Sequence, residues 1–129
     1  MTTKIGILGS TGSIGRQTLS VIDDHPDLFE VVALAAGRNI DLFARQLQRY
    51  RPSLASLAAP AEGFGAGDTE ILVGDEGLRA IATDPEVDIL VVATSGHSSI
   101  APTLEAIKAG KTIALANKEA IVCAGEVLL

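Results

Sequence analysis

The sequence lacks several features that would place it in other classes of protein. Its 129 residues contain one cysteine, Cys123, so an internal disulfide is impossible and a reducing compartment is indicated. Tryptophan is absent and aromatic residues make up only 3%, so the core must be aliphatic. No apolar run approaches the ~20 residues that cross a bilayer, and no signal-peptide pattern opens the chain. We therefore expect a soluble, cytoplasmic protein.

Positive charge is also scarce. Lysine and arginine number 10 against 16 acidic residues, which gives a formal net charge of −6. This balance disfavours nucleic acid and anionic membranes as partners, because no basic surface offsets their phosphate charge. A local basic pocket for a small phosphorylated ligand remains compatible with it. No paired carboxylates and no Cys/His cluster with zinc spacing stand out, so no metal site is predicted in these residues.

Apolar residues make up 47% of the chain and fall into short runs that alternate with helical periodicity. The expected strands are 4–8, 29–36, 53–58, 70–73, 87–93 and 111–116, and the expected helices are 13–23, 40–50, a short one from 75, one near 100–107 and one from 118. This alternation predicts an α/β fold with a doubly wound, mostly parallel sheet, which is Rossmann-like. Residues 1–129 are expected to form one domain. Because the last expected helix has no stop signal, we also expect the 129-residue chain to be a fragment of a longer protein.

The stretch KIGILGSTGSIG (residues 4–15) carries the clearest motif, with a strand followed at once by three glycines. Gly9 would allow the sharp turn, Gly12 would let a ligand approach the backbone, and Gly15 would let the helix pack closely. The amides from Thr11 to Ile14 would then lie at a helix N-terminus, which favours an anion such as a dinucleotide pyrophosphate. The alternative is a tight turn with no ligand.

The residues that follow the second expected strand indicate whether the dinucleotide is NAD or NADP. NAD-binding folds usually place an acidic residue there for the ribose hydroxyls. Here the strand runs instead into Gly37, Arg38 and Asn39. A guanidinium pairs with a 2′-phosphate that a carboxylate would repel, so NADP is favoured over NAD. The alternative is that Arg38 is a solvated loop residue and that Asn39 only caps the next helix.

Two later turns are expected at the same carboxyl edge of the sheet. In one, LANKE (residues 115–119), Asn117 could cap a helix, Lys118 could meet a phosphate or a polarised carbonyl, and Glu119 could accept from a ribose or amide group. The alternative is a helix cap followed by a solvated ion pair. The other turn, TSGHSSI (residues 94–100), contains His97, to which we assign no acid–base role.

In combination, three stretches resemble the N-terminal part of the 1-deoxy-D-xylulose 5-phosphate reductoisomerase family. They are GILGSTGSIGRQTLSVI, AAGRNIDLFARQ and PTLEAIKAGKTIALANKEAIVCAG, which cover most of the chain and keep the order of the family. The weakest match is the loop at 59–69. A second departure is the turn at 94–100, where many members carry a Gly- and Ala-rich sequence, so the resemblance assigns no role to His97 or Ser98.

The resemblance implies an enzyme that rearranges and reduces 1-deoxy-D-xylulose 5-phosphate to 2-C-methyl-D-erythritol 4-phosphate in non-mevalonate isoprenoid synthesis. It implies NADPH, a divalent metal (Mg or Mn) and a homodimer as the parent protein. It places no catalytic residue and no metal ligand in this chain, which alone should be inactive. The roles that it implies here are pyrophosphate binding by Thr11, Gly12, Ser13 and Ile14, 2′-phosphate binding by Gly37, Arg38 and Asn39, NADPH contacts by Asn117 and Glu119, and substrate binding by Lys118. The alternatives are another NADP-dependent dehydrogenase with a Gly-x-Thr-Gly turn and a non-catalytic nucleotide-sensing module.

Overall fold

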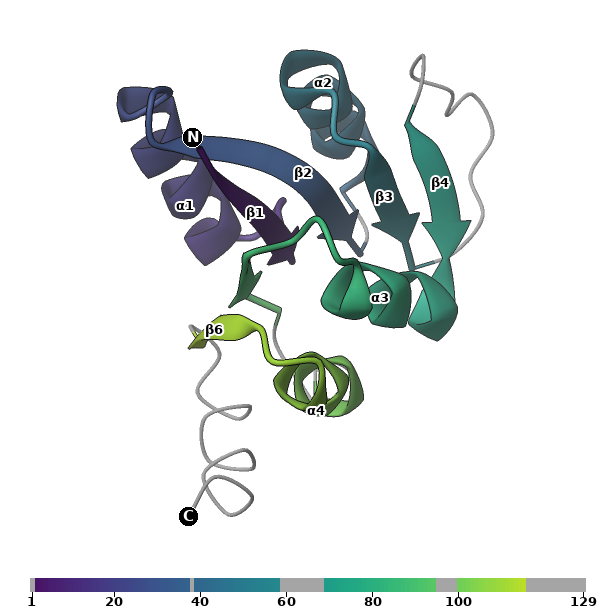
Figure 1. Cartoon of the computed structure of the whole chain (residues 1–129). Coiled ribbons are helices and arrows are strands. Elements are labelled where there is room, and N and C mark those ends of the chain that lie inside the picture. The colour runs from purple at the N-terminus through teal and green to yellow at the C-terminus, as the bar shows by residue number, and fades with distance from the viewer. Residues whose placement is uncertain (1, 38, 59–68, 95–99, 116–129) are drawn as a thin grey trace.

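The computed structural model describes residues 2–37, 39–58, 69–94 and 100–115. In this part of the chain, six strands form one parallel sheet between two helical layers (Figure 1). The elements are β1 (Thr3–Leu8), α1 (Ser13–Asp24), β2 (Phe29–Ala36), α2 (Ile40–Tyr50), β3 (Leu54–Leu57), β4 (Glu70–Val73), α3 (Gly74–Thr83), β5 (Ile89–Val92), α4 (Ile100–Lys108) and β6 (Thr112–Leu115). The expected α/β fold with a parallel, doubly wound sheet is confirmed.

The strand order is β4-β3-β2-β1-β5-β6. From β1 the chain first builds outward through β2 and β3 to β4. It then returns past β1 and places β5 on the other side. The order thus reverses between β1 and β5, and in open α/β sheets ligands bind at the carboxyl ends of the strands next to such a reversal.

Two apolar clusters hold the helices to the two faces of the sheet. On one face, Leu19 and Ile22 of α1 and Phe43 and Leu47 of α2 pack against the sheet. On the other face, α3 and α4 pack through a second cluster that includes Ile81, Ala82 and Ala106. The central strands lie between the two layers, as Figure 1 shows. Both faces are therefore covered at β1 and β2, which carry the turns of interest.

A bulge in β2 explains which of its residues face which cluster. Ile5 pairs with Val31, and the next residue of β1, Gly6, pairs with Ala33, so Val32 is an extra residue in β2. Val32 and Ala33 consequently both join the cluster on the α3 side. Beyond the bulge, alternation resumes up to the carboxyl end of the strand.

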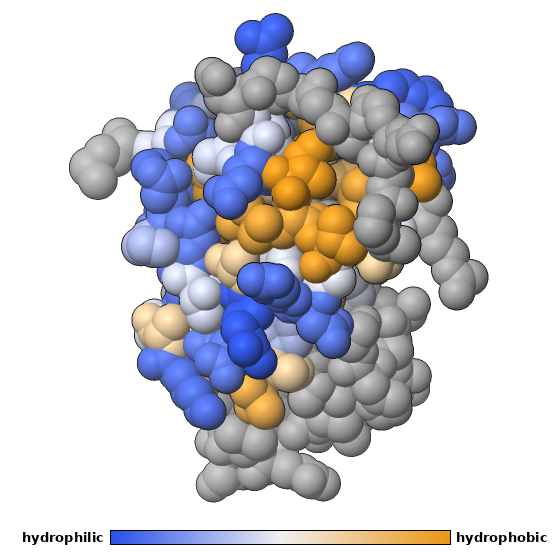
Figure 2. Space-filling view, turned by 90° about the vertical axis from the view of Figure 1, so that its right-hand side faces the viewer, coloured by the Kyte–Doolittle hydropathy of each residue, from blue (hydrophilic) through white to orange (hydrophobic). Residues whose placement is uncertain are grey.

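The β4 side of the molecule is less completely buried than its centre. β4 is the edge strand of the described sheet; its Ile71 and Leu72 are half-buried and its Val73 is 39% exposed. Figure 2, which views this side, shows an apolar patch next to hydrophilic surface. The best-shielded backbone of the sheet is therefore that of the inner strands rather than of this edge.

The structure corrects two local predictions. We expected Ile14, Thr18, Val21 and Ile22 to form the inner face of the first helix, but its buried residues are Gly15, Leu19 and Ile22. Ile14 and Val21 are 40% and 55% exposed. Helical periodicity identified the helix but not its rotation about its own axis, because Ile14 and Val21 lie on an apolar flank beside the packed stripe.

The second correction concerns α3. We expected Asp75 to cap this helix, but the N-cap is Val73, without a side-chain hydrogen bond, and Asp75 lies inside the first turn. By contrast, the predicted glycine cap of α4 is confirmed. Gly110 has φ +79°, and its amide and that of Lys111 donate to the carbonyls of Ile107 and Ala106.

Candidate functional site

Gly9 ends β1 in a conformation that only glycine adopts readily. Its φ is +93°, and a Cβ there would lie 2.9 Å from backbone atoms of Ala93 and Thr94 at the end of β5. The amides of Gly9 and Ser10 both donate to the carbonyl of Ala35 in β2, at 2.8 and 2.9 Å. The turn is thus held from both neighbouring strands, and the predicted role of Gly9 is confirmed.

The other two glycines of the motif differ in what surrounds them. A Cβ on Gly15 would lie 2.1 Å from the carbonyl oxygen of Gly9, so α1 could not start so close to the turn with any other residue. Gly12 has φ −77° and ψ 175°, which any residue can adopt. A Cβ on Gly12 would meet nothing closer than Gly9 O at 3.6 Å. Packing within the described chain therefore explains Gly15 but not Gly12.

The N-terminus of α1 is open. Its N-cap, Gly12, offers no side-chain acceptor, and no acidic residue lies in its first turn. None of the described residues accepts a hydrogen bond from the amides of Thr11, Ser13 or Ile14. These donors and the positive end of the helix dipole are therefore available to an anion.

Two other helices contrast with α1. In α2, Oδ1 of Asn39 accepts from the amide of Leu42 at 3.2 Å, and Asp41 lies in the first turn. In α3, Asp75 and Glu76 lie in the first turn. Acidic side chains at these positions compensate the helix dipole from within the chain. Of these three helix ends, α1 has the one that best suits an external phosphate group.

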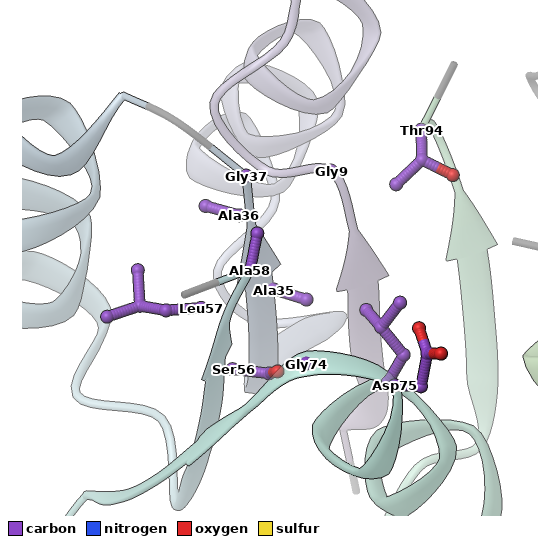
Figure 3. Close-up of a pocket in the computed structure, with 11 residues that line it drawn as sticks. Gly9, Ala35, Ala36, Gly37, Ser56, Leu57, Ala58, Gly74, Asp75 and Thr94 are labelled. Carbon is purple, nitrogen blue, oxygen red and sulfur yellow. The ribbon is translucent and has the colours of Figure 1, made fainter. Parts of the chain in front are cut away.

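A pocket of about 170 Å³ opens beside the glycine turn at the carboxyl edge of the sheet (Figure 3). Glycine, alanine and leucine make up most of its lining, and its polar side chains come from Ser56, Asp75 and Thr94. In full, the lining comprises Gly9, Ala35, Ala36, Gly37, Ser56, Leu57, Ala58, Gly74, Asp75, Leu78 and Thr94. Five segments that are distant in the sequence thus meet at one site.

Thr94 carries an unsatisfied polar atom in this pocket. Its Oγ1 is buried and has no hydrogen-bond partner among the described residues. A buried hydroxyl without a partner is uncommon and calls for an explanation. Because Thr94 follows β5, directly across from Gly9, a bound group at the strand-order reversal would be well placed to satisfy it.

The predicted site residues that are described gather at this edge. Thr11, Gly12, Ser13 and Ile14 form the turn and the start of α1, and Gly37 lines the pocket, with nothing within 4 Å of a Cβ built on it. Asn39 caps α2, which was predicted from the sequence as the alternative to a role in ligand binding. Several predictions lie outside the described residues, namely those for Arg38, His97, Ser98, Asn117, Lys118 and Glu119.

Sequence reasoning missed the contributions of β3 and α3. Ser56, Asp75 and Leu78 line the pocket, but none was predicted as a site residue. One signal was present: β3 was expected to be parallel to β1 and β2, so its carboxyl end had to reach the same edge. The close packing of α3 on β3 was not visible in the sequence. A Cβ on Gly77 would lie 2.0 Å from Oγ of Ser56.

The described residues include no group of three or more His, Cys, Asp or Glu side chains that could hold a metal ion. None of the described helices is both long enough and apolar enough to cross a bilayer. The fold and its carboxyl edge together define a Rossmann-like domain with a glycine-rich turn, an open helix N-terminus and an apolar pocket.

Comparison with known proteins identifies the family. The family model described as 1-deoxy-D-xylulose 5-phosphate reductoisomerase matches residues 5–125, so the chain belongs to this family. A 1-deoxy-D-xylulose 5-phosphate reductoisomerase of Thermomicrobium roseum is 53% identical over 124 residues, which cover 96% of this chain and 32% of that protein.

Solved structures of the family have the same fold. The reductoisomerase from Zymomonas mobilis in complex with NADPH has a TM-score of 0.89 at 34% identity, over 99% of this chain and 35% of that one. A DOX-P reductoisomerase in complex with NADPH, fosmidomycin and magnesium has a TM-score of 0.88 at 37% identity, over 96% and 32%. The chain therefore spans about a third of the length of the relatives that it matches.

Proposed function

We propose that residues 1–129 form the NADPH-binding domain of a 1-deoxy-D-xylulose 5-phosphate reductoisomerase. The complete enzyme would rearrange and reduce its substrate to 2-C-methyl-D-erythritol 4-phosphate, in non-mevalonate isoprenoid synthesis. The observation that carries this proposal is the family match over residues 5–125 together with an open, uncapped helix N-terminus at the strand-order reversal. This combination favours the reductoisomerase over another NADP-dependent dehydrogenase and over a nucleotide-sensing module.

The glycine turn would hold the pyrophosphate. The amides of Thr11, Ser13 and Ile14 are open donors, and Gly12 leaves room for close approach, which fits a doubly charged bridging group. The hydroxyl of Thr94 would gain the partner that it lacks among the described residues. These features are properties of this chain and support the assignment independently of its relatives.

The adenosine end would lie between the ends of β2 and β3. Gly37, Arg38 and Asn39 would hold the 2′-phosphate, with the guanidinium supplying the charge. The apolar walls of the pocket suit a flat base, and Asp75 could accept a hydrogen bond from an exocyclic amino group. Asn39 would serve both as a helix cap and as a ligand, because its Oδ1 is used by Leu42 while its side-chain NH₂ remains a possible donor.

The remaining roles follow from the family. We propose that Asn117 and Glu119 contact NADPH and that Lys118 binds the phosphorylated substrate. In this proposal the chain contributes no catalytic residue. β6 ends at the same edge of the sheet as β1 and β5, which supports a site there. NADPH would supply the hydride when bound, and the residues of this chain would bind and orient it. Magnesium or manganese would be held by residues outside this chain.

The setting proposed for the complete protein is a cytoplasmic homodimer that acts on a small sugar phosphate and binds no nucleic acid. The net charge of −6 supports the last point. The substrate class is supported by relatives that are named for it.

Titration calorimetry with NADPH and, separately, with NADH tests the cofactor assignment. We expect the chain to bind NADPH well above NADH, and we expect Arg38→Ala to lose most of that preference because the 2′-phosphate loses its cation. Arg79→Ala, which removes the same charge from the exposed α3 surface, serves as the matched control. Equal binding of both dinucleotides would refute the role of Arg38, and binding of neither would refute a self-standing cofactor domain.

A further inference from the structure

A glutamine side chain is buried between α2 and the glycine turn. The inner face of α2 consists of Phe43, Gln46 and Leu47, and Gln46 is only 6% exposed. Placing a primary amide between two large apolar residues is costly unless its hydrogen bonds are made. The position therefore needs a reason beyond packing.

Both ends of the Gln46 amide are hydrogen-bonded to one residue. Its Nε2 donates to the backbone carbonyl of Ser10 at 2.9 Å, and its Oε1 accepts from Oγ of Ser10 at 2.7 Å. Ser10 itself is completely buried. The reciprocal pair joins positions 36 residues apart and attaches α2 directly to the turn between β1 and α1.

These bonds orient two successive peptide groups. The Gly9–Ser10 peptide is held through the amide of Ser10, which donates to the carbonyl of Ala35 at 2.9 Å, and the Ser10–Thr11 peptide is held through the carbonyl of Ser10, which accepts from Gln46. The described chain has no cis peptide bond, and in a trans peptide the carbonyl and the following N–H point in opposite directions. The N–H of Thr11 therefore points away from α2. The pocket-lining helix α3 packs on the opposite face of the sheet from α2.

We propose that Gln46 is a positioning residue for the cofactor: it holds the Ser10–Thr11 peptide so that the Thr11 N–H faces the pyrophosphate. Without this bond the peptide could rotate and present a carbonyl oxygen to the phosphate, which would repel it. The inference rests on the proposed function, since it assumes that a dinucleotide occupies the turn. It adds a residue that touches no ligand.

The test compares two ligands on the purified chain. NADP⁺ contains the pyrophosphate, whereas adenosine 2′-monophosphate occupies only the end near Gly37 to Asn39. In Gln46→Met, we expect NADP⁺ to bind about tenfold more weakly or worse, because a charge-assisted hydrogen bond is lost. Adenosine 2′-monophosphate should bind as it does to the unsubstituted chain. Gln48→Met, at an exposed position of the same helix, should bind both as before.

A second variant covers the case in which Gln46→Met does not fold. In Gln46→Glu the ionised side chain has no proton for the Ser10 carbonyl, but the protonated form has one. Relative to the unsubstituted chain at the same pH, its NADP⁺ affinity should be low at alkaline pH and recover as the pH falls. A role in general packing would not produce this recovery.

The outcomes separate the positioning role of Gln46 from the proposed cofactor-binding function. Unchanged NADP⁺ binding in both Gln46 variants overturns the positioning role and leaves the proposed function intact. Equal loss of both ligands also overturns it, because the defect is then general rather than at the pyrophosphate. If the unsubstituted chain binds neither ligand, the self-standing cofactor domain of the proposed function is refuted, and this inference fails with it.

Discussion

The three glycines of the opening turn differ in whether the surrounding structure requires them. Gly9 needs a positive φ, and Gly15 leaves no room for a Cβ. Gly12 has neither constraint from the described residues. The described residues therefore do not require a glycine at position 12, and close approach of a ligand to its backbone stays the prediction for this residue.

A pair of alanine substitutions separates these reasons. Gly12→Ala should lower the free energy of unfolding by only about 1 kcal/mol, the usual cost of alanine at an N-cap, because its backbone angles suit alanine and its Cβ meets nothing closer than 3.6 Å. It should weaken NADPH binding about tenfold, since the methyl group would occupy the space of the pyrophosphate. Urea denaturation and calorimetry measure the two effects.

Gly15→Ala is the matched comparison and should act mainly on stability. Its Cβ would collide with the carbonyl oxygen of Gly9, so the start of α1 must shift, at a cost of about 3 kcal/mol. If Gly12→Ala instead binds NADPH normally, close approach of a ligand does not explain this glycine.

Among the secondary-structure elements, α1 and α2 are joined at the ends that lie away from the glycine turn. Arg49 pairs with the carboxylate of Asp23 at 3.0 Å, and the hydroxyl of Tyr50 donates to the same carboxylate at 2.9 and 3.1 Å. The Arg49 guanidinium also lies 5.6 Å from the centre of the Tyr50 ring. This cluster and the Gln46–Ser10 pair hold α2 at two separate points along its length.

The cluster should make the domain sensitive to alkaline pH. Burial, and then the hydrogen bond to Asp23, raise the pKa of Tyr50 from its ordinary value of 10.0 to about 12. The protonated phenol is therefore favoured by folding, so its contribution to stability is complete below pH 10 and is lost as the pH rises toward 12. Stability measured by urea denaturation should fall across this range, and less so in Tyr50→Phe.

The same pKa can be read directly. Tyr50 is the only tyrosine and the chain has no tryptophan, so phenolate absorbance reports this residue alone. Asp23→Asn should move the titration midpoint of the folded chain toward its ordinary value, because both the hydrogen bond and the charge of the carboxylate contribute to the shift. A midpoint already at the ordinary value in the unsubstituted, folded chain would contradict the arrangement described.

For the whole molecule, the decisive feature is that four strand ends and one helix start meet around a single pocket. β1, β2, β3 and β5 contribute their carboxyl ends, and α3 contributes its first turns. A ligand bound there would contact both halves of the sheet. Binding should therefore stabilise the domain as a unit rather than one loop of it.

This stabilisation can be measured by thermal unfolding. At a hundredfold excess of NADPH over its dissociation constant, linkage predicts a gain of about 2.7 kcal/mol in the free energy of unfolding. For a domain of this size, that gain corresponds to a rise of roughly 10 °C in melting temperature. NADH at the same concentration should give a much smaller rise. Equal shifts with both dinucleotides would argue against selection by the 2′-phosphate.

The order of the helices and strands and the local chemistry of the first turn follow from the sequence alone. The strand ranges predicted from apolar runs differ from those observed by two residues at most. The glycine pattern located the turn at 9–15, and Asn39 was recognised as a helix cap. These features depend on residues that are close neighbours along the chain, where backbone preference, side-chain periodicity and capping act directly.

The contacts between residues that are distant in the sequence became known from the folded structure. It showed that α1 turns Leu19 rather than Val21 toward the sheet, that Ser56, Asp75 and Leu78 share a pocket with Gly9, and that Gln46 holds Ser10. Each of these facts depends on strand order and helix rotation, which are set by the packing of the whole core. Local sequence patterns limit that packing but do not specify it, because many arrangements bury a similar apolar area, whereas long-range polar contacts such as that between Gln46 and Ser10 form in few of them.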